Sequence, residues 1–173
     1  MKKYISMMAM AIALAWGFTA CDVETDEEPG GTNIQNMCGN WEVLWYAVDA
    51  DGNILDEEPW TEGTIYTYNK ADNGTTQMWI DDQNTYLKFQ FLVNINDLGA
   101  MTFSTDGVDY KGNGTSKAFV KKGQILLGQG KNLHGMPTDS IVFEIGLSED
   151  TYPSRYGFDH YRVEGVRYSG FTE

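Results

Sequence analysis

The two histidines are the candidate catalytic bases of the sequence, because hydrolysis by a serine nucleophile needs an imidazole base within hydrogen-bond reach. His134 lies in a glycine-rich segment shortly before Asp139 and Ser140, a grouping that suggests a triad. The sequence contains no Gly-x-Ser-x-Gly nucleophile elbow, however. His160 alternates with Arg162 on an expected strand, which is typical of an outward polar face. We therefore expect an exposed loop position for His134 and assign no catalytic residue.

Two groups of carboxylates suggest carbohydrate or metal chemistry. Asp81 and Asp82 are the kind of pair that glycosidases use, but adjacent strand residues point to opposite faces, which favours a turn. Residues 49–57 are rich in Asp and resemble a calcium loop, yet their Gly52 stands two places earlier than an EF-hand requires. An acidic hairpin turn fits them better, with weak surface Ca²⁺ as the alternative. Neither paired cysteines nor paired histidines suggest zinc, so we expect no metal and no cofactor.

Cys21 follows a cationic start and an apolar run, residues 4–18, that is shorter than the roughly 20 residues a membrane span needs. Small residues directly precede it, and the segment resembles a bacterial lipoprotein lipobox, with Phe18 where leucine is usual. The resemblance implies a signal peptide over residues 1–20 and an acylated Cys21. Ordinary secretion with an incidental thiol is the alternative. Cys38 then has no disulfide partner, and we expect it to be a small buried hydrophobe.

Residues 22–28 contain five acidic side chains and are followed by Pro-Gly-Gly, a composition typical of a flexible tether over residues 21–33. An acidic stretch after the lipidated cysteine resembles the surface-export signal of lipoproteins from the Bacteroidetes. It implies an outer-membrane lipoprotein exposed at the cell surface, and a plain spacer is the alternative. The acyl chains would supply the membrane attachment, since two or more chains hold a protein stably.

The composition limits the partners of the remaining chain. The 173 residues carry 12 Lys+Arg against 25 Asp+Glu, so nucleic acid and passive docking on anionic lipid are both disfavoured. The length corresponds to one domain, and 42% hydrophobic residues are enough for a core.

Alternating polar and apolar residues separated by turn signals dominate the chain from residue 34 onward. The clearest case is 86–95, where every odd position is apolar. We expect strands at 41–48, 64–68, 76–80, 86–95, 101–104, 108–110, 116–120, 124–127, 140–147 and 160–168. This spacing predicts an all-β fold over residues 34–173, an antiparallel up-and-down calycin-like (lipocalin-like) β-barrel of about 8–10 strands.

Alternation also predicts which side chains point into the barrel. The expected inward set, which either fills the lumen or lines a cavity for one apolar ligand, is Trp41, Val43, Trp45, Leu87, Phe89, Phe91, Val93, Ile141, Phe143 and Ile145. These are the candidate ligand-binding residues. Tyr46, Tyr66, Tyr68 and Trp79 are expected to point outward, where they could stack on a glycan or contact a protein partner.

Gly39-Asn40-Trp41 at the start of the first strand resembles the lipocalin and calycin group. In that group the strand-one tryptophan closes one barrel end under an arginine of the last strand, which here implies Arg162 or Arg167. Segments 68–73, 78–82, 139–145 and 165–171, together with the lipobox, resemble a family of Bacteroidetes lipoproteins described as lipid-binding putative hydrolases. The resemblance implies a calycin-like barrel that binds lipid.

These observations favour a membrane-tethered, non-catalytic barrel that holds a small hydrophobic ligand such as a lipid or fatty acid. One alternative is an accessory surface lipoprotein that binds glycan or an outer-membrane protein. The other is a lipid or ester hydrolase.

Overall fold

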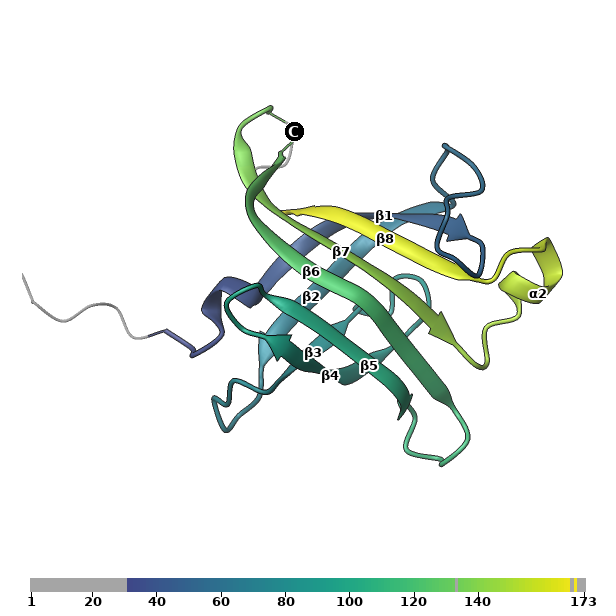
Figure 1. The fold of residues 1–173 in the computed structure, drawn as a ribbon, viewed down its shortest axis with the longest axis horizontal. Coiled ribbons are helices and arrows are strands. Elements are labelled where there is room, and N and C mark those ends of the chain that lie inside the picture. Colours follow the sequence, from purple (N-terminus) through teal and green to yellow (C-terminus); the bar gives the residue numbers. More distant parts are fainter. Residues whose placement is uncertain (1–30, 133, 169, 171–173) are drawn as a thin grey trace, which may run out of the picture. The chain divides into compact units, whose positions relative to one another are not determined.

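Eight antiparallel strands close into one barrel in the computed structural model, which describes residues 31–132, 134–168 and 170. Each strand pairs with its neighbours in sequence, and the first pairs with the last (Figure 1). The strands are β1 (Gly39–Val48), β2 (Thr61–Asn69), β3 (Gln77–Asp81), β4 (Gln90–Asp97), β5 (Thr102–Asp109), β6 (Lys117–Lys131), β7 (Pro137–Leu147) and β8 (His160–Arg167). All of them lie in the compact unit Thr32–Glu173. The predicted up-and-down barrel is confirmed.

The strands are fewer than the ten segments expected because two predicted turns are β-bulges. Gly107 lies inside β5 and Lys122 inside β6, both with positive φ, and the strand register shifts at both places. A bulge inserts an extra residue and bends a strand without ending it. The glycine-rich segment after Leu127 is likewise part of β6, which continues to Lys131. The prediction of separate short strands there was wrong.

The barrel has two ends with different coverings. At one end, which we call the sealed end, lie the short 3₁₀ helix η1 (Gln35–Met37) and the β2–β3, β4–β5 and β6–β7 connections. The opposite end carries the four connections 49–60, 82–89, 110–116 and 148–159. The last of these contains the short helix α2 (Tyr152–Tyr156). We call this second end the aromatic end, for the rings described below.

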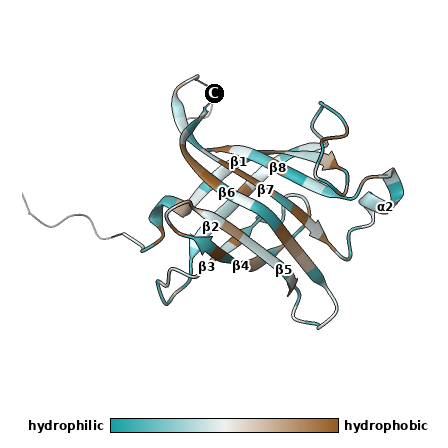
Figure 2. Cartoon of the chain, viewed as in Figure 1, coloured by the Kyte–Doolittle hydropathy of each residue, from teal (hydrophilic) through white to brown (hydrophobic). Residues whose placement is uncertain are grey.

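Hydrophobic residues are concentrated in the strands and hydrophilic residues in the connections (Figure 2). Every second residue of β1 from Trp41 onward is buried in the lumen through Trp45, as the alternation predicts. The described residues include no helix that is both long enough and apolar enough to cross a bilayer.

Candidate ligand-binding site

The sealed end is closed by a hydrogen-bonded tryptophan. The Trp41 indole Nε1 donates to Thr67 Oγ1 at 2.9 Å, and that hydroxyl donates to the Met37 carbonyl at 2.6 Å. Met37 belongs to η1 and is fully buried, as is Ile34 just before it. These contacts fix η1 across the barrel end, so ligand access at this end would require unpacking the helix.

Arg167 covers Trp41 from the last strand. Its guanidinium carbon lies 4.5 Å from the indole centroid, and its side chain also donates to the carbonyls of Cys38 and Asn36. Its Nε donates to Asp139 at 2.9 Å. Of the two arginines that the sequence left open, Arg167 is thus the one over the tryptophan.

Arg162 lies elsewhere, on the outer face of β8. Its Nε donates to Glu164 at 2.5 Å, two residues along the same strand. Inward and outward positions alternate along a strand, so Arg162 is on the opposite face from Val163 and Arg167. It therefore takes no part in closing the end.

The predicted ligand-binding residues are placed in the lumen with one exception. Nine of them are 3% exposed or less: Trp41, Val43, Trp45, Phe89, Phe91, Val93, Ile141, Phe143 and Ile145. Leu87 is half-buried in the 82–89 connection and packs at the edge of the core. A side chain that lined a water-sized cavity would keep accessible surface, so these nine side chains fill the lumen by packing on one another.

The rings of the lumen continue to the molecular surface at the aromatic end. Trp45 packs edge-on against Tyr86 and Tyr161, with centroids 5.2 and 5.7 Å away. Tyr86 in turn stacks on Tyr152 of α2 at 6.3 Å. Such ring pairs contribute roughly 0.5–1.5 kcal/mol each beyond the area they bury.

Trp60 is the outermost part of this arrangement together with α2. Its ring lies 5.1 Å from Tyr156, 5.2 Å from Phe158 and 6.2 Å from Tyr152. Tyr156 is 52% exposed. We call Trp60, Tyr152 and Tyr156 the aromatic lid.

Sequence reasoning missed the lid because its residues lie in connections without strand periodicity. One signal was available: residues 152–161 contain four aromatic side chains around a proline-initiated turn. A surface loop seldom contains so many aromatic residues unless their rings pack against an apolar surface.

A single carboxylate shapes the connection beneath the lid. Asp82, fully buried, accepts the backbone N–H groups of Asn84, Tyr86, Lys88 and Phe89 at 2.7–3.3 Å. The expected strand 86–95 therefore starts only at Gln90, since residues 86–89 bond to this side chain instead of a neighbouring strand. The turn interpretation of Asp81 and Asp82 agrees with these bonds.

Two tyrosine hydroxyls meet below the lid. Tyr86 Oη and Tyr161 Oη are 3.0 Å apart, and Tyr161 is fully buried. Burial, reinforced by contacts with Tyr86 and the Asp150 carboxylate, raises the pKa of Tyr161 far above its ordinary value. Burial likewise raises the pKa of Tyr86. The aromatic end thus contains a neutral polar pair inside an apolar surrounding.

His160 differs from the expected exposed polar position. It lies on the outer wall but is only 5% exposed, with Nε2 3.3 Å from Glu144 Oε2 and its ring beside Phe119. Lys122 donates to the other oxygen of Glu144 at 2.8 Å. The 49–53 turn packs closely over this group, since a methyl group on Gly52 would collide with Glu144. His160 therefore points outward, as predicted, but it is buried on the outer wall instead of lying on an exposed polar face.

The other catalytic and metal candidates have structural partners. Asp139, which stands near His134 in the sequence, accepts from Arg167 and from the Gly128 backbone N–H. Asp49 accepts the backbone N–H of Asn53, and bonds to Asn53 lower the pKa of this carboxyl. Among the described residues, no group of three or more His, Cys, Asp or Glu side chains is arranged to hold a metal ion.

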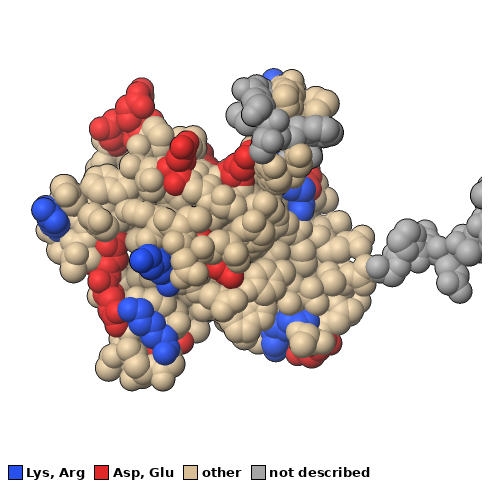
Figure 3. Space-filling view, turned by 180° about the vertical axis from the view of Figure 1, so that it is seen from behind, with Lys and Arg blue, Asp and Glu red and all other residues tan. Residues whose placement is uncertain are grey.

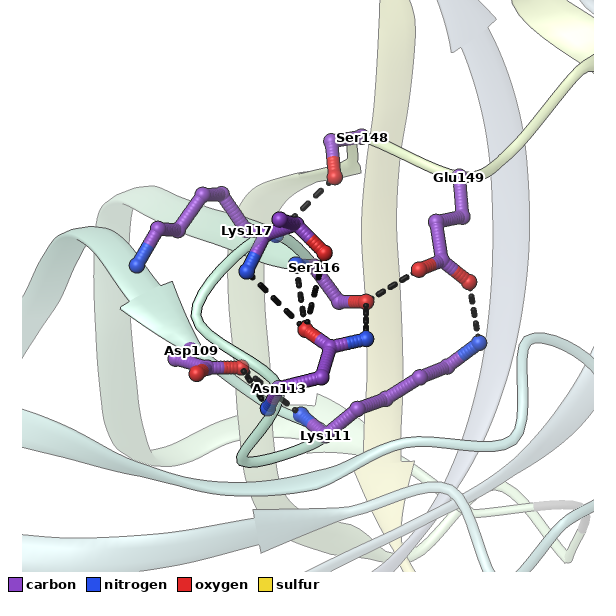
Figure 4. Close-up of polar contacts among 8 residues, drawn as sticks. Asp109, Lys111, Asn113, Ser116, Lys117, Ser148 and Glu149 are labelled. Carbon is purple, nitrogen blue, oxygen red and sulfur yellow. Dashed lines mark hydrogen bonds and ion pairs between the residues drawn. The ribbon is translucent and has the colours of Figure 1, made fainter.

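A polar network ties the 110–116 connection to the 148–159 connection (Figure 4). Glu149 bonds both the Lys111 ammonium and the buried Ser116 hydroxyl, and Asn113 Nδ2 donates to Ser116 Oγ at 2.7 Å. Lys111 and Ser116 lower the pKa of Glu149. The network holds the 110–116 connection beside the segment that precedes α2.

The outer wall carries a second kind of surface. A hollow of about 640 Å³ lies over β8, β1 and β2, with Leu44 and Tyr46 among its lining residues. Tyr68 and Trp79 stack at 6.4 Å farther along the wall. Tyr66, Tyr68 and Trp79 are half-buried, and the Tyr68 hydroxyl already bonds Gln90 and Asp81. Cys38 is also half-buried and free, whereas Cys21 lies outside the described residues.

Comparison with known proteins gave one family match. The model of a family described as lipid-binding putative hydrolase matches residues 26–172. No curated protein matches the chain.

Proposed function

The chain belongs to the lipid-binding putative hydrolase family, as the sequence resemblance predicted, and from this premise we propose that it binds one lipid molecule through the aromatic end of its barrel. In this proposal the aromatic lid moves aside, the packed rings of Trp45, Phe89 and Phe91 rearrange, and the acyl chain takes the space between them. The binding is non-catalytic.

The observation that carries the proposal is the difference between the two ends. The sealed end is fixed by Trp41, Thr67 and Arg167 through hydrogen bonds to η1. The aromatic end is covered by the rings of Trp60, Tyr152 and Tyr156, which lie on two twelve-residue connections, 49–60 and 148–159. The exposed rings of Tyr152 and Tyr156 can move into solvent while the backbone bond from Trp60 to the Trp45 carbonyl stays in place, so we expect this end to open at lower free-energy cost.

The balance of free energies favours such an exchange. Opening the lid forfeits ring pairs worth roughly 0.5–1.5 kcal/mol each. Burying an acyl chain gains about 0.8 kcal/mol per methylene group. Ten buried methylenes therefore outweigh the loss of the three Trp60 pairs and the Tyr86–Tyr152 stack, and the difference must also cover the rearrangement of the packed lumen.

The test is native mass spectrometry of residues 22–173, which contain the whole closed barrel, after incubation with fatty acids, monoacylglycerols and phospholipids. We expect one bound lipid per chain, with binding weakened by Trp60→Ala and unchanged by Trp79→Ala on the outer wall. A protein that stays at its apo mass with every lipid class would overturn the proposal. Loss of binding in Trp79→Ala but not in Trp60→Ala would move the site to the outer wall.

The proposal includes attachment to the outer membrane through acylated Cys21, supported by the lipobox and the acidic tether. Metabolic labelling with radioactive palmitate should label the full chain and not its Cys21→Ser variant. Protease added to intact cells should remove the barrel if it is displayed at the surface. Labelling that persists in Cys21→Ser would refute the anchor.

A further inference from the structure

One buried donor at the aromatic end has no protein partner. Trp45 is 1% exposed, and its Nε1 donates no hydrogen bond to any of the described residues. An unpaired buried N–H costs about 1–3 kcal/mol and is rare in folded proteins. The equivalent donor of Trp41, at the sealed end, is paired with Thr67 at 2.9 Å. The contrast points to a ligand acceptor at Trp45.

Gly63 lies close in front of this donor. A methyl group built on Gly63 would lie 3.3 Å from Trp45 Nε1 and 3.5 Å from Thr85 Oγ1, so both polar atoms border the same position. Thr85 is exposed on the 82–89 connection, and its hydroxyl donates to the Asp82 carbonyl at 2.6 Å. Thr85 therefore connects the position beside the indole N–H with the surface.

Charge at this end disfavours an anionic head group. The 49–60 connection contains five acidic residues and no basic one, and Figure 3 shows acidic side chains gathered toward the end of the barrel that carries it, at the left of that view. The 148–159 connection adds Glu149, Asp150 and Asp159 against Arg155. The β2–β3 connection at the opposite end has only the paired Lys70 and Asp72, 3.1 Å apart.

The interior of the aromatic end has the same preference. Asp150 Oδ2 is buried without a partner among the described residues, and its carboxylate lies near the Tyr86 and Tyr161 hydroxyls. A second carboxylate brought close to it would be repelled in a poorly solvated surrounding.

We infer that the lipid bound at the aromatic end has an uncharged head group with a hydrogen-bond acceptor, such as the ester of a monoacylglycerol, and that Trp45 Nε1 donates to this acceptor beside Gly63 and Thr85. Free fatty acids, which carry a carboxylate at neutral pH, are discriminated against. The inference rests on the proposed function and specifies its ligand class.

The experiment compares monolauroylglycerol with laurate, which has the same acyl chain, by isothermal titration of residues 22–173 near neutral pH. We expect monolauroylglycerol to bind at least about tenfold more tightly at low salt, since like-charge approach opposes laurate alone. High salt should bring the laurate affinity closer to that of monolauroylglycerol, whose own affinity stays unchanged.

Gly63→Ala and Thr85→Val test the position in front of Trp45 Nε1. Gly63 does not have positive φ, so alanine is conformationally acceptable there, and its methyl group fills the position in front of Trp45 Nε1. Gly63→Ala should weaken monolauroylglycerol binding about tenfold while leaving laurate nearly unaffected, because its methyl group keeps the acceptor from Trp45 Nε1 and loss of one hydrogen bond of about 1.4 kcal/mol corresponds to that factor. Thr85→Val changes the side chain beside the same position and should weaken monolauroylglycerol binding by less. Gly99→Ala, in the β4–β5 connection at the sealed end, is the matched control and should bind like the wild type.

The outcomes separate the two levels of the argument. If neither probe nor any phospholipid binds, the proposed function itself fails. If laurate binds as tightly as monolauroylglycerol, or if Gly63→Ala and Thr85→Val bind both probes normally, lipid binding stands and the inference about the head group is overturned.

Discussion

At the residue scale, the aromatic end depends on side chains that satisfy or withhold hydrogen bonds. Asp82 gathers four backbone N–H groups and so gives the 82–89 connection a defined shape without a strand partner. Tyr86 and Tyr161 satisfy one another, whereas Trp45 Nε1 has no protein partner. The 82–89 connection therefore has a defined backbone, whereas one buried donor beside it has no partner among the described residues.

Asp82→Asn should destabilise the protein strongly. The amide replaces one of two acceptor oxygens with a donor and leaves buried backbone N–H groups unpaired, a loss of about 3 kcal/mol in the free energy of unfolding. Urea denaturation measures it. The control, Asp72→Asn in an exposed turn that also bonds a backbone N–H, should lose less than about 1 kcal/mol. Equal losses in both variants would contradict the role of Asp82.

Tyr161 should make the fold sensitive to alkali. Its pKa is raised in the folded state, so its stabilising contribution is complete below the unfolded pKa of about 10 and is lost as the pH rises above that value. Stability should fall with pH above about 10 in the wild type and less steeply in Tyr161→Phe. Urea midpoints measured across this range test it. Parallel pH profiles would show that Tyr161 titrates normally.

At the element scale, connections at the aromatic end are braced against each other. The Lys111–Glu149–Ser116 network joins the β5–β6 turn to the segment that precedes α2 (Figure 4). Asp150, next to Glu149, accepts the backbone N–H of Tyr152 at 2.9 Å. The start of α2 is thereby bonded to Asp150, the residue next to the Glu149 of this network.

Glu149→Gln should remove an acid-dependent part of the stability. The folded pKa of Glu149 is lowered, so its contribution is present above the unfolded value of about 4.3 and disappears as the pH falls through the lower folded pKa. The melting temperatures of wild type and Glu149→Gln should differ near neutral pH and converge in acid. Glu57→Gln, on an exposed loop, is the control. A difference that persists unchanged into strong acid would contradict the assignment.

At the scale of the whole molecule, the two ends of the barrel are built differently, and the proposed lipid site lies at only one of them. Trp41, Arg167 and η1 link the first and last strands at the sealed end. The aromatic end carries the exposed rings of Trp60, Tyr152 and Tyr156. Acidic side chains lie at this end with basic ones among them (Figure 3). Substitutions at the sealed end should therefore change stability with little effect on lipid affinity.

Arg167→Ala tests this division. It removes a cation–π contact, two bonds to carbonyls near η1 and the Asp139 pair, which together stabilise the fold by about 2 kcal/mol. Arg162→Ala removes only a pair with Glu164 on the outer wall and should cost less than about 1 kcal/mol. Chemical denaturation gives both values, and a larger loss in Arg162→Ala would reverse the assignment.

The alternation in the sequence was sufficient to predict the barrel and most of its inward set, because the period of two depends only on local geometry. It could not distinguish the bulges at Gly107 and Lys122 from turns, since the same residue types adopt positive φ in both. The sequence also could not predict that the lumen is packed, because this depends on how side chains from eight strands fit together. The sequence left Arg162 and Arg167 as candidates for the arginine that covers Trp41. The strand register, which places Arg167 opposite Trp41, decided between them.

The pairing of β1 with β8 has a consequence for biogenesis. Gly39 and Arg167 lie at opposite ends of the barrel sequence, and register places Trp41 directly across from Arg167. Until the last strand is synthesised, β1 and β7 both present open edges that invite pairing with other chains. The barrel consequently closes only after β8 has been synthesised.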